Sequence, residues 1–396
     1  MVYGMKTRLR VLYVTSTFAR TADDSEDPWQ GELARRLARQ VDLTVLAPAW
    51  RGGRDHDWQG IPVHRFRYLP AVMETLTHGA GASVNSRTLA GKLAAVPYLL
   101  AGHTALQREL LARPYDVLHL HWPVPHALWL WPYLPAAPRV VLHWYGVEMP
   151  LARRLPGGMA LLRAALRRAD ANIAISRHTA DALVPFAPQP LAVIPYGITC
   201  GTPLPRPVQP ANTILFVGRL VARKGVDVLL RAFAIFCQSV SGWKLVIIGD
   251  GPQRGKLEMI ARGLDMDEDI VFRGRVSHDE LRAAYAAATL FALPAVSDTA
   301  GETEGLGVVL LEALHNRVPV VASRIGGITD VITDDGTGAL VPPGDAAALA
   351  AALVALARDP ARAARLADDG AALLRGPFAW EHITAAMLAA YGAGHA

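Results

Sequence analysis

The chain has 396 residues, about twice what one hydrophobic core usually supports, so its length predicts two domains. Apolar residues make up 52% of the chain and charged residues 19%, which excludes a disordered or collagen-like protein. With only two cysteines, a disulfide framework is also excluded, and a reducing compartment is favoured.

No secretory signal is visible, and no apolar stretch approaches the roughly 20 residues that a membrane span needs, so we expect a soluble, cytoplasmic protein. Residues 1–200 carry 22 Lys and Arg against 14 Asp and Glu, a net charge of +8, whereas residues 201–396 have a net charge of −3. A basic half can attract nucleic acid, anionic lipid or an anionic small substrate. Because no zinc-finger or RNA-binding signature occurs, we expect no nucleic-acid partner. Two interpretations of the basic half remain: it contacts an anionic membrane peripherally, or its arginines simply lie on solvated helix faces.

Short β-rich runs alternate with longer amphipathic runs along the first half, as in a mostly parallel sheet covered by helices. The predicted strands span residues 9–14, 43–46, 61–65, 117–121, 140–142, 171–175 and 192–195, with helical patterns at 32–39 and 161–168 between them. The proline-rich stretch TPLPRPVQP at 202–210 cannot continue a helix or a central strand. We interpret it as the interdomain linker.

The same alternation restarts after this stretch. The predicted strands span 213–217, 244–248, 270–272, 290–293, 318–321 and 339–341, and the helices 226–236, 253–261, 279–286, 308–315 and 346–356. This pattern predicts two Rossmann-like α/β domains, residues 1–202 and 203–376, followed by residues 377–396 with a helix that packs back toward the first domain. Ligands of such sheets bind where strands lead into helix N-termini, so we expect a site in a cleft between the domains.

A basic loop with glycine at both ends, GRLVARKG, begins at Gly218 directly after the predicted strand TILFV. It includes the cations Arg219 and Lys224, and its glycines let the backbone approach a ligand closely. A pyrophosphate requires positive charge together with fixed amide donors at a helix N-terminus, and this loop offers both. The sequence is not a Walker A motif, and an ordinary basic loop between strand and helix is the alternative interpretation.

A second motif, EGLGVVLLE, has one carboxylate at Glu304 and another at Glu312. The amides between Gly305 and Gly307 would offer donors to an anion, and carboxylates accept sugar hydroxyl hydrogen bonds with a defined geometry. Alternatively, Glu304 is a charge favoured by the helix dipole and Glu312 lies on a solvated face. Glu312 nevertheless interrupts an apolar stretch, and burial of an acid is costly unless the acid has a function there.

These two motifs resemble glycosyltransferase family 4, whose members are retaining enzymes with the GT-B fold. The resemblance extends over essentially the whole chain through IPYG at 194–197, IGDGP at 248–252, FRGRV at 272–276, the glycine pair at 326–327 and VPPGD at 341–345. Tyr196 stands where the family has asparagine. The resemblance implies two Rossmann-like domains that face each other across a cleft, and a nucleoside-diphosphate sugar (a UDP- or GDP-sugar) as co-substrate.

The resemblance also implies roles for the motifs of the second domain. Arg219 and Lys224 would hold the diphosphate and stabilise it as it leaves, Glu304 would face the donor sugar, and Glu312 would bind the ribose hydroxyls. The other implied donor-binding positions are Gly218, Gly305, Leu306, Gly307 and the backbone near Arg275 and Val276, which would receive the nucleobase.

The first domain resembles the family less clearly. The resemblance assigns His121, in HLHWP, to the family's strand-end histidine that contacts the donor sugar. His119, on the same strand face, is the alternative for this role. A histidine that only packs in the core or lies in a loop is the non-functional interpretation. Gln30 and Gly31 lie where relatives have a glycine-rich loop that places acceptor and donor phosphate. Here that segment has only one glycine and follows the acids Asp23, Asp24, Glu26 and Asp27.

His143 ends the next predicted strand but departs from the family's His-Gly pair, so it receives no role. Four tryptophans lie close to His143 in the sequence: Trp122, Trp129, Trp131 and Trp144. Such residues pack in a core, stack on a sugar acceptor or anchor at a membrane interface, and the sequence leaves these possibilities open.

The implied reaction passes through an oxocarbenium-like transition state, whose largest demand is charge stabilisation on the departing phosphate. Arg219, Lys224 and helix amides would meet this demand, and no Asp-x-Asp occurs in a suitable loop, so we expect no metal and no cofactor. We expect front-side attack, with the leaving phosphate taking the acceptor proton. The expected acceptor is a sugar or lipid-linked hydroxyl of bacterial cell-surface polysaccharide or glycolipid synthesis. A sugar-nucleotide epimerase and a non-catalytic nucleotide-sugar-binding protein are the alternatives.

Overall fold

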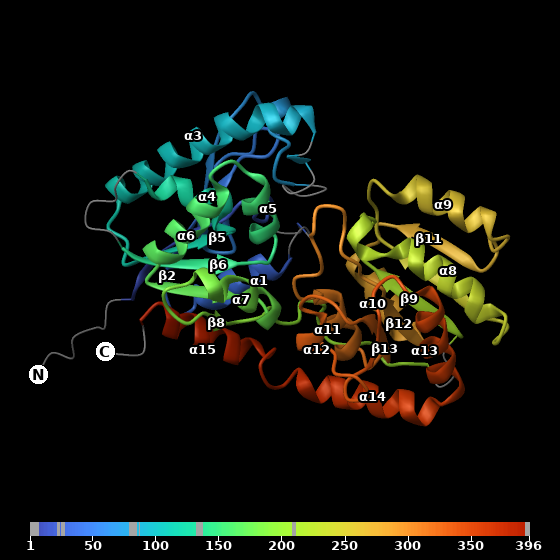
Figure 1. The fold of residues 1–396 in the computed structure, drawn as a ribbon. Helices are drawn as coiled ribbons and strands as arrows, with labels where there is room; N and C mark the ends of the chain where they lie inside the picture. The colour runs from blue at the N-terminus through green and yellow to red at the C-terminus, as the bar shows by residue number, and fades with distance from the viewer. Residues whose placement is uncertain are drawn as a thin grey trace, which may run out of the picture. The chain divides into compact units, whose positions relative to one another are not determined.

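The structure, a computed structural model, describes residues 8–21, 24, 28–78, 85–86, 88–131, 138–207 and 211–392. The chain forms two compact units: Met1–Ile175, Thr179–Ile194 and Trp380–Ala396 make up the first, and Ser176–His178 with Pro195–Ala379 make up the second. Each unit contains a sheet with helices on both faces, which confirms the predicted fold class (Figure 1). Of the predicted features, Asp23, Glu26, Asp27 and residues 208–210 lie outside the described residues.

The first unit is built on an eight-stranded sheet in the order β3-β4-β2-β1-β5-β6-β7-β8. Its strands are β1 (Arg10–Val14), β2 (Asp42–Pro48), β3 (His56–Trp58), β4 (Ile61–Phe66), β5 (Val117–His121), β6 (Arg139–Trp144), β7 (Ala171–Ala174) and β8 (Ala192–Val193). Neighbouring strands are parallel except β3 and β4. The sequence analysis missed β3, because three residues are too few to show an alternating pattern.

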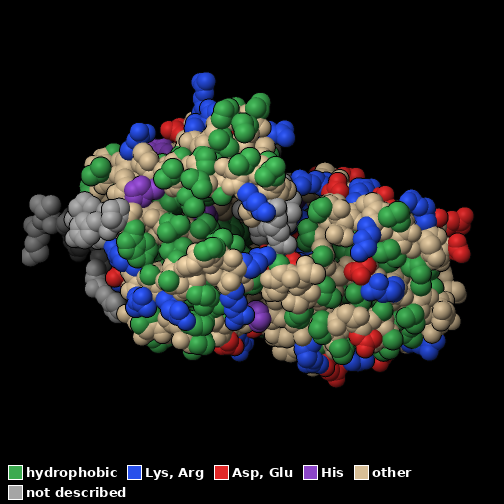
Figure 2. Space-filling model, turned by 45° about the horizontal axis from the view of Figure 1, so that its top comes forward, with side chains coloured by type: hydrophobic (Ala, Val, Ile, Leu, Met, Phe, Trp, Pro, Cys, Tyr) green, Lys and Arg blue, Asp and Glu red, His purple; other side chains and the backbone are tan. Residues whose placement is uncertain are grey.

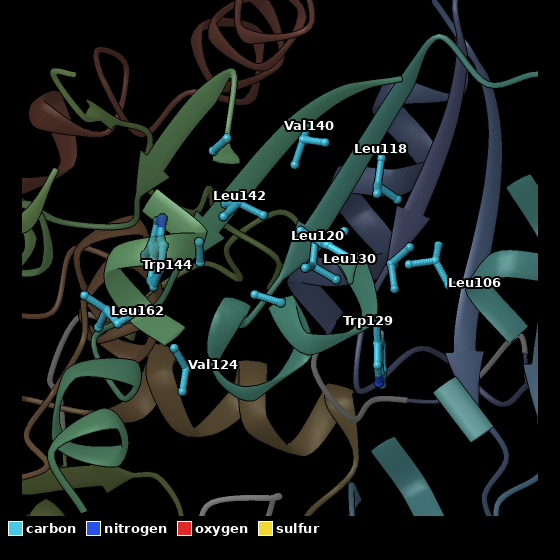
Figure 3. Close-up of a cluster of buried hydrophobic side chains, with 14 of the residues drawn as sticks. Leu106, Leu118, Leu120, Val124, Trp129, Leu130, Val140, Leu142, Trp144 and Leu162 are labelled. Carbon is cyan, nitrogen blue, oxygen red and sulfur yellow. The ribbon is translucent and has the colours of Figure 1, made fainter. Parts of the chain in front are cut away.

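Helices cover both faces of this sheet (Figure 1). They are α1 (Pro28–Leu37), α3 (Leu89–Ala112), α4 (Pro123–His126), α5 (Glu148–Arg154), α6 (Gly158–Arg168), α7 (Arg177–Leu183) and α15 (Trp380–Ala390), with short 3-10 turns η1 (Ala71–Met73), η2 (Ala127–Leu130) and η3 (Val184–Phe186). On one face, α3 to α6 enclose a core around Trp129 and Trp144 (Figure 3). These two tryptophans are therefore core residues.

The C-terminal helix α15 belongs to the first unit. Trp380, Ile383 and Met387 recur at helical spacing and pack with Leu33 and Leu37 of α1 in the core on the other face of the sheet. The last segment of the chain thus completes a core whose other members come from residues 11–194.

The second unit is built on a six-stranded sheet in the order β11-β10-β9-β12-β13-β14, with all neighbours parallel. Its strands are β9 (Thr213–Val217), β10 (Lys244–Ile248), β11 (Ile270–Gly274), β12 (Leu290–Leu293), β13 (Val320–Ser323) and β14 (Ala339–Val341). Its helices are α8 (Val226–Cys237), α9 (Arg254–Gly263), α10 (His278–Ala287), α11 (Val308–His315), α12 (Ile328–Val331), α13 (Ala346–Arg358) and α14 (Pro360–Leu373), with the 3-10 turn η4 (Ala222–Lys224).

The unit boundary differs from the predicted domain boundary at 202/203, because residues 195–202 pack with the second unit. The carbonyl of Gly201 lies 2.8 Å from the imidazole Nε2 of His315. Arg206, inside the proline-rich stretch, donates hydrogen bonds to two backbone carbonyls of the second unit, at 2.6 and 3.2 Å. The described part of that stretch is therefore bound to the second unit along its length rather than suspended as a linker.

Two long helices, α3 and α14, were not predicted. Helix α3 is apolar on all sides, so its sequence lacks the periodic pattern of an amphipathic helix. Helix α14 begins with Pro360 after Asp359, whose carboxylate accepts from the amide of Arg362 and caps the helix. None of the helices in the described ranges combines the length and apolar character that a bilayer crossing requires.

Candidate active site

The order of the second sheet changes direction at β9. The chain runs outward from β9 through β10 to β11 and then returns to the other side of β9 with β12. The loops that follow β9 and β12 therefore separate at neighbouring strand ends, which is where open parallel sheets bind ligands. The two sequence motifs GRLVARKG and EGLGVVLLE come from these loops.

The loop after β9 is held against the end of β12 by a glycine. Gly225 has a left-handed φ of 64° and stands between η4 and the first turn of α8. A Cβ atom at this position would lie 1.9 Å from the carbonyl oxygen of Pro294, so only glycine fits. The turn buries Lys224, the residue just before Gly225, beside the N-terminus of α8.

Lys224 and Glu304 form a buried ion pair. The Nζ of Lys224 lies 2.5 Å from Oε2 of Glu304, and a guanidinium nitrogen of Arg223 lies 3.5 Å from the same oxygen. Burial alone would raise the pKa of the Glu304 carboxyl, but the charges of Lys224 and Arg223 outweigh burial and hold that pKa well below its usual range. Arg219, whose side chain is exposed, lowers it further. Three cations thus surround one carboxylate.

The glycine pair at 326–327 explains how Glu304 is held. The amide of Gly327 donates to the carbonyl of Glu304 at 2.9 Å. A Cβ atom would lie 2.2 Å from the carbonyl of Glu304 at position 326, and 2.0 Å from the carbonyl of Gly305 at position 327. The segment at 304–307 therefore packs backbone to backbone on the loop after β13.

The variant Gly327→Ala is expected to displace the segment at 304–307. Overpacking of this kind costs about 1–3 kcal/mol of stability, and loss of the fixed amides lowers nucleotide affinity. Differential scanning fluorimetry and calorimetric titration with a nucleoside diphosphate measure both effects. Gly255→Ala in α9 is the matched control, because a Cβ atom there meets nothing within 4 Å. Unchanged stability and affinity in Gly327→Ala would contradict this account of the glycine pair.

Glu312, at the centre of α11, is buried and hydrogen-bonded. The hydroxyl of Tyr285 in α10 donates to its Oε2 at 2.8 Å. Burial raises the pKa of Glu312 to about 6, against the opposing effect of hydrogen bonds from Tyr285 and Thr199. The solvated-face interpretation of Glu312 is therefore excluded.

The sequence analysis missed two members of this site. Arg223 was part of the quoted loop but received no role, although it contacts Glu304. Tyr285 carried no motif at all; its signal would have been a tyrosine inside an Ala-rich helix, where a buried hydroxyl needs a partner.

Arg275 and Val276, the predicted positions near the nucleobase, lie between β11 and the Ser277 cap of α10. Arg275 is exposed and Val276 is half-buried.

In the first unit, the loops after β1 and β5 likewise follow neighbouring strands, and three histidines lie on β5 and β6. His121 pairs in register with His143, and the Nδ1 atoms of His119 and His121 lie 2.8 and 2.5 Å from the hydroxyls of Tyr391 and Tyr145. All three imidazoles are fully buried. Contact between either candidate histidine and a sugar would require neighbouring side chains to move, and the donor-sugar role of His121 stays a prediction.

These histidines are the one group of potential metal ligands among the described residues. One nitrogen of each of His119, His121 and His143 lies within 4.8 Å of the others. No carboxylate belongs to the group, and the rings of His119 and His143 are stacked at an interplanar angle of 10° rather than turned toward a common point. A dication buried there would have no anionic ligand, which is costly. We interpret the group as packed neutral imidazoles.

We predicted that Gln30 and Gly31 lie in a loop near the acceptor. This prediction is wrong, because both residues lie inside helix α1 and are buried. The Gln30 amide donates to the Thr15 hydroxyl at 3.1 Å and its carbonyl accepts from the Tyr13 hydroxyl. A Cβ atom at Gly31 would lie 2.8 Å from the Trp58 ring. These two residues secure α1 to the sheet.

Both halves of the chain match models of known families. Residues 206–372 match the model "Glycosyl transferases group 1", and residues 31–201 match the model "Glycosyltransferase Family 4". The GDP-mannose-dependent alpha-(1-6)-phosphatidylinositol monomannoside mannosyltransferase of Mycolicibacterium smegmatis is 30% identical over 84% of this chain and 86% of its own length. The chain belongs to glycosyltransferase family 4. The predicted resemblance is confirmed.

Other family 4 relatives and solved structures agree over the whole length. The Mycobacterium tuberculosis enzyme of the same description is 28% identical over 96% of this chain and 97% of its own. Sucrose-phosphate synthase from Thermosynechococcus elongatus superposes with a TM-score of 0.74 at 22% identity, covering 98% of this chain and 99% of its own. HepE of Anabaena, solved with UDP and glucose, gives 0.72 at 18% identity, covering 97% and 100%. The GT-B fold and a glycosyltransferase function that uses a nucleotide sugar are confirmed.

Proposed function

We propose that this family 4 glycosyltransferase moves a sugar from a nucleoside-diphosphate sugar to a hydroxyl acceptor with retention of anomeric configuration and without a metal ion. The observation that carries the proposal is the cluster of Arg219, Arg223 and Lys224 around Glu304 at the ends of β9 and β12. Three cations against one carboxylate leave a net charge of +2, which complements a diphosphate.

Arg219 and Lys224, with the amides from Gly305 to Gly307, would stabilise the diphosphate as the bond from the anomeric carbon to the phosphate oxygen breaks. Such preorganised charge acts where negative charge develops and requires no metal. In this proposal Glu304, held ionised by its cations, would stabilise positive charge on the sugar ring. The acceptor oxygen bonds to the same face of the anomeric carbon, and its proton passes to the departing phosphate oxygen.

The relatives support the donor and acceptor classes that we propose. The mycobacterial enzymes are described as GDP-mannose-dependent and as acting on a phosphatidylinositol mannoside, whereas HepE was solved with UDP. We infer a UDP- or GDP-sugar donor, placed with its ribose hydroxyls on Glu312 and its base near Arg275 and Val276. We further infer a lipid-linked acceptor, peripheral contact with an anionic membrane, and no nucleic-acid partner.

Calorimetric titration with UDP, GDP, ADP and dTDP, each with and without EDTA, tests the donor site. We expect one nucleotide to bind with an affinity that EDTA leaves unchanged. Glu312→Gln is expected to weaken this binding about tenfold, because it loses a charged acceptor for the ribose hydroxyls. Lys256→Ala, at an exposed position of α9, is the control. Absence of binding by all four nucleotides would overturn the donor site.

The stereochemistry has its own test. The anomeric coupling constant of the product, read by NMR against that of the donor sugar, is expected to show retention. A glycosyl adduct trapped on Glu304 would refute front-side attack, and an inverted product would refute the retaining mechanism.

A further inference from the structure

Helix α3 carries large apolar residues on its exposed face as well as on its buried face. Its buried positions are Gly91, Ala94, Tyr98, Gly102 and Leu106. The large side chains on its outer face are exposed by 75% at Leu89, 68% at Leu93, 63% at Val96 and 64% at Leu100. Positions i, i+4, i+7 and i+11 fall on one side of a helix, so these four form a continuous stripe.

Two more exposed apolar side chains belong to η1, the turn that precedes α3 in the chain. Val72 is 83% exposed and Met73 is 52% exposed. The segment just after η1 and the first turns of α3 form walls of one pocket of about 340 Å³, through Thr75 and Leu76 on one side and Gly91 and Ala94 on the other. In Figure 2, hydrophobic side chains gather on the part of the first unit that carries α3, with Lys and Arg side chains among them. Leu89, Leu93, Val96, Leu100, Val72 and Met73 are called the α3 patch below.

The charges around the α3 patch are of one sign. Between Ala71 and Arg108 the sequence has a single carboxylate, Glu74. Glu74 is fully buried, and Arg67 lies 2.5 Å from its Oε1. Lys92, one turn from Leu89 on the edge of the stripe, is exposed, as is Arg51 at the pocket. An apolar stripe with basic residues at its edge is the pattern of a helix that lies in the surface of an anionic bilayer.

The pocket on the buried side of α3 lies at the ligand-binding edge of the sheet. Trp50 and Arg51, which line it, follow the carboxyl end of β2, the edge where parallel sheets bind ligands. A lipid surface on the α3 patch would thus lie next to the edge where a lipid-linked acceptor has to enter.

We propose that the α3 patch docks the first unit on an anionic phospholipid bilayer, with the axis of α3 in the plane of the membrane surface. The inference deepens the proposed function, because it rests on a lipid-linked acceptor. A second copy of this chain is the weaker occupant: a two-fold contact would bring the same basic edge residues of both copies together, without acidic partners.

Co-sedimentation with vesicles tests the docking surface. The wild-type chain is expected to bind vesicles of phosphatidylcholine with phosphatidylglycerol at low salt, and pure phosphatidylcholine vesicles more weakly. Leu93→Ser/Leu100→Ser is expected to weaken binding at least about tenfold through lost apolar burial. Lys92→Glu is expected to weaken it about fivefold and to reduce its salt dependence. Ile235→Ser/Met259→Ser, two exposed apolar residues of the second unit, is the matched control.

Two further readouts keep the test decisive. Circular dichroism melting of the double variant is expected to match the wild type, because both leucines are exposed. Nucleotide binding is also expected to be unchanged, so a failure of the donor site and a failure of the docking surface are separate results. Vesicle binding that is absent in the wild type or unchanged in Leu93→Ser/Leu100→Ser would overturn the proposal. It would also be overturned if the double variant only converts a dimer to a monomer in size-exclusion chromatography.

Discussion

Lys224→Ala is expected to lower kcat/KM for sugar transfer by about 10²–10³-fold, the usual effect of removing one preorganised donor from a developing anion. The variant removes the cation that lies 2.5 Å from Glu304 and leaves Arg223 at 3.5 Å as the nearest remaining cation. Stopped-time assays with a labelled donor, once the nucleotide panel has identified it, measure the loss. Lys256→Ala is the control for removal of a lysine.

A double variant separates catalysis from stability. Breaking a buried pair leaves an uncompensated charge and costs about 3–5 kcal/mol, so Lys224→Ala is also expected to melt at a lower temperature. Lys224→Ala/Glu304→Gln removes that stranded carboxylate and is expected to recover the melting temperature but not the activity. Recovery of activity in the double variant would show that Lys224 serves only to neutralise Glu304, and would contradict its role at the diphosphate.

The first unit is expected to unfold steeply as the pH falls below 6.5. Burial lowers the pKa of His119 to about 3 and those of His78 and His126 to about 4, and it lowers those of His121 and His143 well below their usual value. These rings are neutral in the folded state, while the unfolded chain takes up protons near 6.5. Their stabilisation is present above 6.5 and is lost as the pH falls toward the folded-state pKa values.

The size of this effect follows from linkage. Each depressed imidazole costs about 1.4 kcal/mol per pH unit below 6.5. Glu148 opposes it, because burial raises its pKa to about 8 and its protonated form stabilises the fold as the pH falls. About four imidazoles remain uncompensated, or roughly 5.5 kcal/mol per pH unit, against a usual total of 5–15 kcal/mol. Calorimetric melts between pH 7 and 5 measure the slope.

His119→Phe supplies the control for this titration. It removes one titrating ring from the buried group and is expected to reduce the slope by about one proton. His278→Ala changes an exposed histidine at the start of α10 and is expected to leave the slope unchanged. A melting temperature that is constant from pH 7 to 5 would contradict the neutral packing of these imidazoles.

Local patterns predicted most of the sheet strands, because buried parallel strands such as TILFV and KLVII are continuous apolar runs between helices. Most residues of the proposed donor site could also be named from their motifs. What the sequence could not show is the pairing of Lys224 with Glu304, which lie 80 positions apart. That contact depends on β12 returning to the side of β9, which is a property of the sheet order.

The first unit was harder to predict for a different physical reason. Helix α3 carries apolar residues on its exposed face as well as on its buried face, so its sequence shows no amphipathic pattern to detect. The role of Gln30 depends on its tertiary contacts. Its side-chain amide group is hydrogen-bonded to Tyr13 on β1 and to Thr15 just after that strand, and its segment forms helix α1 rather than a loop. In both cases the neighbours that decide the conformation are distant in sequence.

Because α15 closes a core formed by residues 11–194, the second unit is in effect an insertion between strand β8 and the last helix of the first unit. During synthesis, β1 to β8 leave the ribosome with one apolar face only partly covered, by α1. At about 5–20 residues per second, the missing helix follows roughly 10–40 seconds later. The second unit can fold as soon as it emerges, whereas the first is completed only when translation ends. A stop codon shortly before Trp380 would therefore leave the first unit, most of which is synthesised first, without the helix that completes its core.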